Sequence, residues 1–164
     1  MSLITPGLDS ERDLRDALAS FATGVTIITA DTADGPMGIT ANSFTAVSLD
    51  PPLVLWCPAK SSSRFRHFVE PAHFAVHVLS AAQRETCGLF AKGNQGFAGT
   101  TPARNPENVP VLDGVLARFD CALWNSIDAG DHAVVIGRVL RAYRHDGAPL
   151  IFAQGGYGRF TAES

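Results

Sequence analysis

Short runs of β-branched residues, each followed closely by glycine, proline or aspartate, most strongly constrain the fold of this chain. The first run covers residues 25–29, and Asp34-Gly35-Pro36 after it predicts a turn into a second strand. The return run, residues 37–49, is too long for one flat strand, so we expect a bend near residues 41–43. Asp50-Pro51-Pro52 then ends the run. The pattern predicts a hairpin at the start of a sheet.

More runs of this kind follow along the chain. Phe74-Ala75-Val76-His77-Val78-Leu79 is one of them, and His145-Asp146-Gly147 predicts a hairpin turn between the last two strands. The 15 glycines and 10 prolines also favour a turn-rich architecture over a bundle of long helices. The predicted strands are residues 25–29, 37–49, 53–57, 74–79, 115–127, 132–143 and 150–153.

Three short helices are predicted between these strands. Ser10 is a candidate N-cap for the first helix, in which apolar residues recur at helical spacing until the chain reaches Gly24. Ser80 and Gln83 form a capping-box pattern, which predicts a second helix that runs to about residue 92. Three consecutive serines, residues 61–63, can cap a further short helix over residues 64–69.

These elements predict a mainly β fold. Their irregular order disfavours the alternation of a doubly wound parallel sheet. Gly155-Gly156-Tyr157-Gly158 has neither the spacing of a dinucleotide-binding fingerprint nor a helix after it. We therefore expect a six- to seven-stranded antiparallel split β-barrel of Greek-key type with two or three short flanking helices. One domain is expected over residues 1–164, with residues 1–9 as a flexible N-terminal arm.

The charge of the chain is modest. Thirteen Lys and Arg against 16 Asp and Glu give a net charge of −3, without a block of like charges, so a nucleic-acid partner is not expected. The apolar stretches are far shorter than the roughly 18 residues of a membrane span. The N-terminus also lacks the pattern of a signal peptide. We expect a cytoplasmic protein that does not enter a membrane.

Neither the cysteines nor the histidines have a spacing suited to a metal site. Cys57, Cys87 and Cys121 lack any Cys-x-x-Cys spacing and lie in apolar surroundings, which is typical of buried structural thiols. His73 and His77 share a predicted strand, where four positions span about 13 Å. The sequence therefore predicts no metal site.

Two polar segments interrupt the apolar pattern in the first half of the chain. Residues 38–44 place small and hydroxyl side chains within a strand, where a planar ligand can approach the backbone. A bulged strand with surface threonine and asparagine explains this pattern equally well. Residues 61–63 form a hydroxyl-rich loop between Lys60 and Arg64, whose donors suit a phosphate. Serine caps at the surface are the equal alternative.

Two further segments lie in the second half. Lys92, one of only two lysines, ends a predicted helix, where it would complement the helix dipole or contact a second phosphate. His132 opens a strand directly after Gly130-Asp131 and can face a pocket, although a hydrogen-bonded structural histidine is the more frequent case. The glycine-rich residues 154–158 would form a flexible wall beside it.

The order of these segments resembles the short-chain flavin reductase family from about Leu14 to Phe160. The chain departs from that family at Gln154 and Gly156, where relatives often carry glycine and arginine. The resemblance rests on Phe21-Ala22-Thr23-Gly24-Val25-Thr26-Ile27-Ile28-Thr29, on Gly38-Ile39-Thr40-Ala41-Asn42-Ser43-Phe44-Thr45-Ala46-Val47-Ser48-Leu49-Asp50-Pro51-Pro52-Leu53-Val54, on Gly130-Asp131-His132, and on Gly155 with Tyr157.

This resemblance implies an FMN-binding split barrel that works as a homodimer. It also implies that NADH or NADPH reduces FMN or FAD, often for a partner monooxygenase. For the flavin it implies Thr40, Ala41, Asn42 and Ser43 at the isoalloxazine ring, and Ala59, Ser61, Ser62, Ser63 and Lys92 toward the ribityl phosphate. For the nicotinamide it implies His132 as the candidate catalytic residue, together with Gly155 and Tyr157.

The leading hypothesis is an NAD(P)H:flavin oxidoreductase that supplies reduced flavin to a separate monooxygenase. Because the cofactors carry the redox chemistry, this function also explains why no acid–base pair stands out in the sequence. The alternative is a flavin-binding electron carrier or sensor without a pyridine nucleotide site, which would need neither His132 nor residues 155–159. A purely structural barrel is a third hypothesis.

Overall fold

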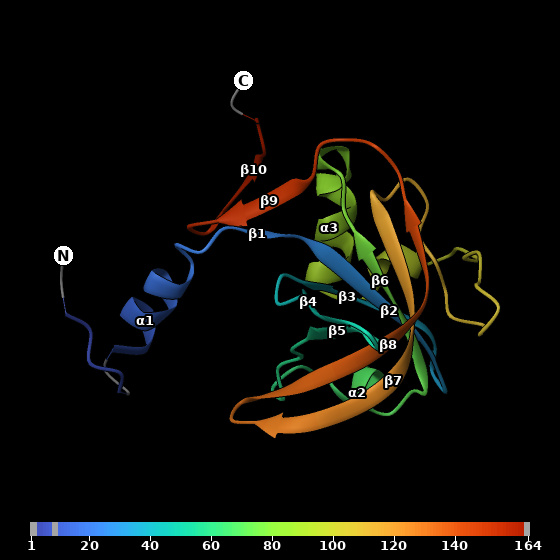
Figure 1. Ribbon diagram of the computed structural model, residues 1–164, viewed down its shortest axis with the longest axis horizontal. Coiled ribbons are helices and arrows are strands. Elements are labelled where there is room, and N and C mark those ends of the chain that lie inside the picture. Colours follow the sequence, from blue (N-terminus) through green and yellow to red (C-terminus); the bar gives the residue numbers. More distant parts are fainter. Residues whose placement is uncertain (1–2, 8–9, 163–164) are drawn as a thin grey trace.

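The computed structural model describes residues 3–7 and 10–162, and its strands form two sheets (Figure 1). The larger sheet is antiparallel and has seven strands in the order β3-β2-β6-β7-β8-β5-β4, with β3 and β4 at its open edges. An open seven-stranded sheet confirms the predicted split barrel. Of the arm predicted over residues 1–9, positions 1, 2, 8 and 9 lie outside the described residues. The strands are β1 (Thr23–Gly24), β2 (Thr26–Thr32), β3 (Gly35–Ala41), β4 (Thr45–Leu49), β5 (Pro52–Trp56), β6 (His73–Val78), β7 (Ala117–Ala129), β8 (His132–Arg144), β9 (Leu150–Ala153) and β10 (Gly156–Arg159).

The first strands follow the prediction. β2 and β3 form the expected hairpin, in which Thr32 pairs with Gly35 beside the turn. β3 ends at Ala41 and β4 begins at Thr45, which confirms the bend predicted near residues 41–43. β4 then pairs with β5 at the other edge of the sheet. Residues 42–44 therefore connect the two edges.

The helices are α1 (Glu11–Leu18), α2 (Arg66–Val69) and α3 (Arg84–Ala91), and α3 follows the 3-10 turn η2 (Ala81–Gln83). The capping box of Ser80 and Gln83 forms as predicted. Ser10 occupies the N-cap position of α1 as predicted, but its hydroxyl makes no capping hydrogen bond and instead donates to the Thr5 carbonyl oxygen at 2.7 Å. None of the helices in the described ranges is long and apolar enough to cross a membrane.

Two apolar clusters pack against the larger sheet and bury both faces of β2. Ile28 belongs to one cluster, which also contains Phe68 of α2. Its neighbour Ile27 belongs to the other, which contains Phe90 of α3. Successive residues of a strand point to opposite faces, so the unbroken run of residues 25–29 is explained by burial on both sides.

The second sheet, in the order β1-β9-β10, corrects the prediction for the C-terminal region. The hairpin predicted at residues 145–147 is wrong, because β9 pairs with β1 and β10 rather than with β8. Leu150 lies outside the larger sheet because its side chain is buried in the cluster around α3. Its N–H donates to the Leu79 carbonyl oxygen. Gln154 and Gly155, both at positive φ, form a tight turn into β10. Residues 154–158, predicted as a flexible wall, therefore form the β9–β10 turn and most of β10.

Candidate functional site

The open edge of β3 leaves backbone groups available at Thr40. Along this edge the Asn94 carboxamide accepts from the Gly38 N–H and donates to the Pro36 carbonyl oxygen. Alternate residues of an antiparallel strand direct their backbone groups to the same side, so Thr40 directs its N–H and C=O to this edge as well. Within the described ranges nothing pairs with them. Thr40 therefore offers one donor and one acceptor to a flat ligand.

A cleft of 270 Å³ opens between the β3–β4 bend and the tip of the β7–β8 hairpin. Three separate segments meet there, because the loop after β5 forms a backbone bridge to the start of β8. Trp56 lines the cleft while only 1% exposed, and its indole N–H lacks a hydrogen-bond partner among the described residues. The predicted site residues that line this cleft are Thr40, Ala41, Asn42, Ser43, Ala59, Ser62 and His132.

Two hydroxyls of the bend fix its shape. Ser43 Oγ accepts from the Cys57 N–H at 2.9 Å, which ties the bend to the end of β5. Thr40 Oγ1 donates to the Cys87 carbonyl oxygen at 2.8 Å, which ties β3 to α3. Since both side chains are engaged within the protein, the backbone of this segment is the part that a ligand can use.

A second cleft, of 190 Å³, shares residues 40–42 with the first. Tyr157 forms part of its wall and is held from three sides. Its ring packs against Phe152 with centroids 5.0 Å apart, the Arg84 guanidinium lies over it, and the Cys87 thiol donates to its hydroxyl at 3.5 Å. The hydrogen bond with Cys87, followed by burial, raises the pKa of Tyr157. The hydroxyl is therefore protonated at neutral pH.

The two cations beside the serine loop are bound within the protein. Lys60 Nζ donates to Asp128 Oδ1 at 2.8 Å and to the Gly130 carbonyl oxygen at 2.7 Å. Arg64 donates to three carbonyl oxygens around the C-terminal end of α3. Phosphate binding by this loop was one of two equal alternatives in the sequence, and these contacts show both cations holding loops together.

The remaining predicted residues are less closely gathered. Ser62 Oγ accepts from the Arg64 N–H at 3.2 Å, and the serines on either side of it are exposed. Lys92 is exposed at the C-terminal cap of α3, and Gly155 lies in the β9–β10 turn. Neither residue lines the two clefts. The structure thus brings together the residues predicted around the flat ligand more closely than those predicted around a phosphate.

His132 is oriented by the residue before it. Its Nδ1 lies 2.8 Å from Asp131 Oδ1. The hydrogen bond from His132 lowers the pKa of the Asp131 carboxyl, so Nδ1 carries the proton and the carboxylate accepts it. Nε2 is then the ring nitrogen that no described residue engages. The pair sits at a two-residue turn in which Gly130 adopts φ +66°, as the first position of such a turn requires.

Sequence reasoning missed Asp131, Arg84 and Phe152. The signal for Asp131 was its position directly before His132, where a carboxylate can orient the ring. Arg84 and Phe152 contact Tyr157 from distant parts of the chain, and no local pattern connects them.

The described residues hold no group of histidine, cysteine and acidic side chains that could bind a metal ion. His77 is fully buried: its Nδ1 lies 3.1 Å from the Ile27 carbonyl oxygen and its Nε2 accepts from the Leu112 N–H. Burial lowers its pKa to about 4, so this histidine is neutral and structural. All three thiols are free; Cys87 and Cys121 are buried as predicted, and Cys57 is half-buried.

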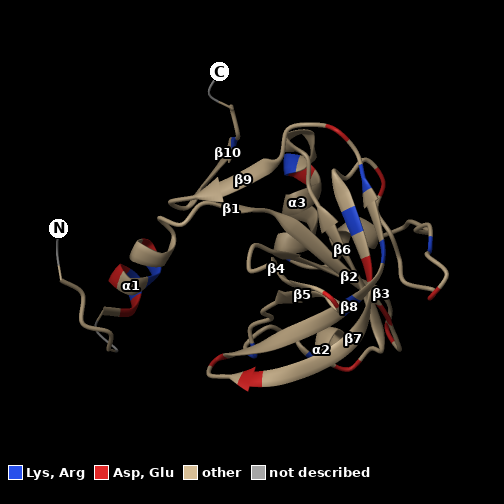
Figure 2. Cartoon of the chain, viewed as in Figure 1, with Lys and Arg blue, Asp and Glu red and all other residues tan. Residues whose placement is uncertain are grey.

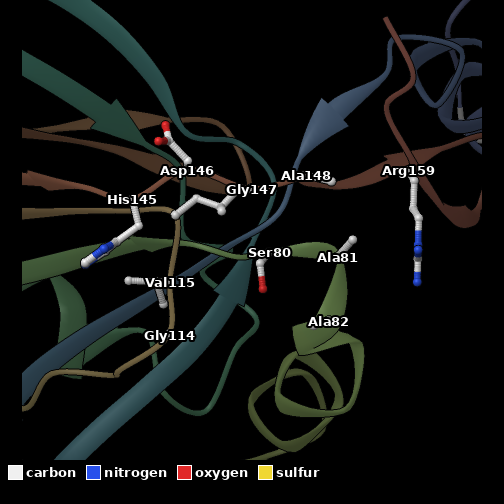
Figure 3. A pocket seen from close by; sticks show the side chains of 11 residues that line it. Ser80, Ala81, Ala82, Gly114, Val115, His145, Asp146, Gly147, Ala148 and Arg159 are labelled. Carbon is white, nitrogen blue, oxygen red and sulfur yellow. The ribbon is translucent and has the colours of Figure 1, made fainter.

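A larger cleft, of 570 Å³, lies between η2 and residues 145–148. Figure 3 shows His145 and Asp146 at one end of it and Arg159 at the other, with Ser80 between them. These polar groups do not converge, and none of the site residues that the family resemblance implied individually lines this cleft. We therefore assign the candidate site to the two clefts at residues 40–42.

Residues 18–161 match the family described as flavin reductase like domain. FMN reductase (NADH) SmoA of Agrobacterium fabrum is 50% identical over 161 residues, which cover 98% of this chain and 92% of SmoA. The reductase component of the flavin-dependent trigonelline monooxygenase of Acinetobacter baylyi is 43% identical, and the match covers 89% of this chain but 48% of that protein. This chain thus spans about half of that relative. NADH:FAD oxidoreductase SgcE6 of Streptomyces globisporus, also solved with NAD and FAD fragments, has a TM-score of 0.91 at 33% identity, covering 100% of this chain and 99% of SgcE6.

Proposed function

The chain belongs to the flavin reductase like domain family, and we propose that its flavin and its nicotinamide nucleotide meet over residues 40–42. The protein is an oxidoreductase that reduces FMN or FAD with NADH or NADPH. The observation that carries the proposed site is a shared wall: residues 40–42 line two adjoining clefts, one beside His132 and one beside Tyr157. Hydride transfer needs two rings held at reactive distance, and this wall can be reached from both clefts.

The residues of the wall fit a flat ring with a polar edge. Ala41 and Ala59 are small enough to let a ring lie close to the backbone. Thr40 offers its backbone N–H and C=O at the open edge of β3. Bound flavin supplies the hydride acceptor. The protein orients the rings, donates hydrogen bonds where negative charge develops and excludes water.

We propose that His132 borders the nicotinamide. Asp131 holds the proton on Nδ1, which fixes the ring and leaves Nε2 to face the ligand. Replacing His132 with alanine is expected to slow NADH-dependent flavin reduction more than it weakens flavin binding. His145→Ala, at the larger cleft, is the matched control and keeps normal turnover. Unchanged turnover in the His132 variant would remove this residue from the site.

The other contacts proposed for the ligands follow the family pattern. Tyr157 and Gly155 would border the nicotinamide, and Tyr157 is supported by its place in the second cleft. On the ribityl-phosphate side, Ala59 and Ser62 are supported by their place in the first cleft. Ser61, Ser63 and Lys92 complete the proposed phosphate side, supported by side chains that are exposed to an incoming anion.

A homodimer is part of the proposal. α1 stands apart from the larger sheet, and none of its residues is buried (Figure 1). On its apolar side Leu18 is 67% exposed, and Phe21 just beyond it is 79% exposed. Val47 and Leu49 of the edge strand β4 are exposed as well. A helix of 8 residues is marginal in water unless its apolar face is packed. A second copy of this chain would cover both surfaces.

We further propose that the reduced flavin serves a separate flavin-dependent monooxygenase. The support is the trigonelline monooxygenase relative, whose name states that it is a reductase component. A cytoplasmic location is proposed with it, since NADH and NADPH are supplied there.

A further inference from the structure

The tip of the β7–β8 hairpin, which carries His132, is fastened to the loop after β5. Lys60 Nζ binds both Asp128 Oδ1 and the Gly130 carbonyl oxygen, at 2.8 and 2.7 Å. The Lys60 N–H also donates to the Asp131 carbonyl oxygen at 2.9 Å. Three contacts from one residue therefore hold the end of β7 and both residues of the turn that precedes His132.

The Lys60 contacts add to a backbone bridge between Ala59 and His132, beside which the Ala133 N–H donates to the Pro58 carbonyl oxygen at 3.1 Å. Asp128 and Asp131 are strongly exposed, with side chains 81% and 92% accessible. In Figure 2 the hairpin of β7 and β8 extends away from the rest of the sheet, with acidic residues near its tip. Its turn also contains Gly130, which has no side chain to pack. The turn is thus held mainly by its contacts with the loop after β5.

An ion pair this exposed contributes little to global stability. The ion pair has a more specific effect on the position of the turn. The second acceptor of Lys60 is the Gly130 carbonyl, and the Asp131 carboxylate that orients the His132 ring follows directly in the chain. A shift of this turn would move Asp131 and His132 together, relative to the first cleft.

We propose that Lys60 is a positioning residue for His132, and that its ammonium fixes the turn rather than binding a flavin phosphate. The proposal rests on the proposed function, because it needs His132 to border the nicotinamide. It differs from the expectation drawn from the sequence, in which a cation beside three serines suited a phosphate.

The two roles of Lys60 predict different kinetics. If Lys60 acts through His132, Lys60→Met lowers kcat for NADH-dependent flavin reduction about tenfold, since a displacement near 1 Å can cost up to about a hundredfold. The affinities for FMN and for riboflavin, which has no phosphate, stay unchanged. Lys60→Arg restores most of the rate, because a guanidinium can reach both acceptors.

A double-mutant cycle with His132→Ala is the test, measured as steady-state NADH oxidation with FMN. We expect Lys60→Met to change kcat less than twofold once His132 is alanine, because coupled residues are not additive. Arg144→Met is the matched control: it breaks the exposed Arg144–Asp146 pair at the other end of β8 and leaves kcat unchanged.

Four results would overturn the proposal. An equal loss from Lys60→Met with and without His132 would show that Lys60 acts independently of the histidine. Weaker binding of FMN but not of riboflavin would make Lys60 a phosphate ligand. A slow His132→Ala enzyme beside a normal Lys60→Met enzyme would remove the positioning role and leave the proposed function intact, whereas a normal His132→Ala enzyme would remove both.

Discussion

The Arg84 guanidinium carbon lies 3.7 Å from the centroid of the Tyr157 ring. This contact joins the first residue of α3 to β10 and forms the outer support of the second cleft. Phe152 and Cys87 hold the same ring from other directions. The orientation of Tyr157 therefore depends on a cation that sequence reasoning had not connected with it.

Arg84→Met is expected to raise the KM for NADH about two- to fivefold, with little change in the affinity for flavin. A cation–π contact at an exposed site contributes about 0.5–1 kcal/mol. Removing it would weaken the support of Tyr157, which borders the nicotinamide in the proposed site. Steady-state kinetics with saturating FMN measures it, and Arg66→Met on α2 is the control. A KM that does not move in Arg84→Met would mean that Tyr157 needs no support from this side.

Ser43→Ala is expected to lower the free energy of unfolding by about 1–3 kcal/mol, because the Cys57 N–H loses its acceptor in a half-buried position. Urea unfolding in the absence of flavin measures this loss. Ser61→Ala removes an exposed hydroxyl and should change stability by less than about 0.5 kcal/mol. Equal stability of the two variants would contradict a structural role for Ser43.

Because His77 is buried, the free energy of unfolding is expected to fall in mild acid. Burial lowers its pKa from 6.5 to about 4, so between these values the unfolded chain binds a proton that the folded chain does not. The stabilisation is therefore complete above pH 6.5 and is lost as the pH falls toward 4, by about 3 kcal/mol in total.

The measurement is the midpoint of urea unfolding at several pH values in this window. His77→Gln keeps a donor and an acceptor without the titration, so its stability should vary less with pH. His73→Gln, on the same strand, should keep the wild-type slope. A His77→Gln protein with an unchanged slope would assign the effect to other groups.

The homodimer predicts that the chain has twice its monomer mass in solution. Phe21→Glu places a charge on the apolar side of α1 and should shift the protein toward monomer, as measured by light scattering after size exclusion. Arg12→Glu changes the charge on the opposite side of the helix and should leave the dimer intact. A wild-type protein that is monomeric at all concentrations would contradict the proposed dimer.

Local signals in the sequence were sufficient for much of the fold. The Ser80–Gln83 capping box and the break between β3 and β4 depend on neighbouring residues, and both are found as predicted. The hairpin at residues 145–147 was wrong because Leu150 is held by a distant core cluster, a contact that no local pattern encodes.

The candidate site also contains some residues that local patterns predicted and others whose roles depend on distant contacts. Residues 40–43 could be found from their small and hydroxyl side chains in a strand, and they do line the clefts. The roles of Lys60 and Arg64 could not be found, because a cation looks alike in sequence whether its partner is a phosphate or a distant carbonyl. Only the three-dimensional contacts distinguish a cation that binds a phosphate from one that binds a carbonyl oxygen.

The most direct test of the central claim is the oxidation of NADH and NADPH by the purified protein with FMN, with FAD and without added flavin. We expect nucleotide oxidation that depends on flavin, and slower oxidation in His132→Ala at an unchanged flavin affinity. Activity only with added flavin would identify flavin as a diffusible substrate of the reductase. A protein that binds FMN tightly yet oxidises neither nucleotide with either flavin would contradict the account and favour an electron carrier.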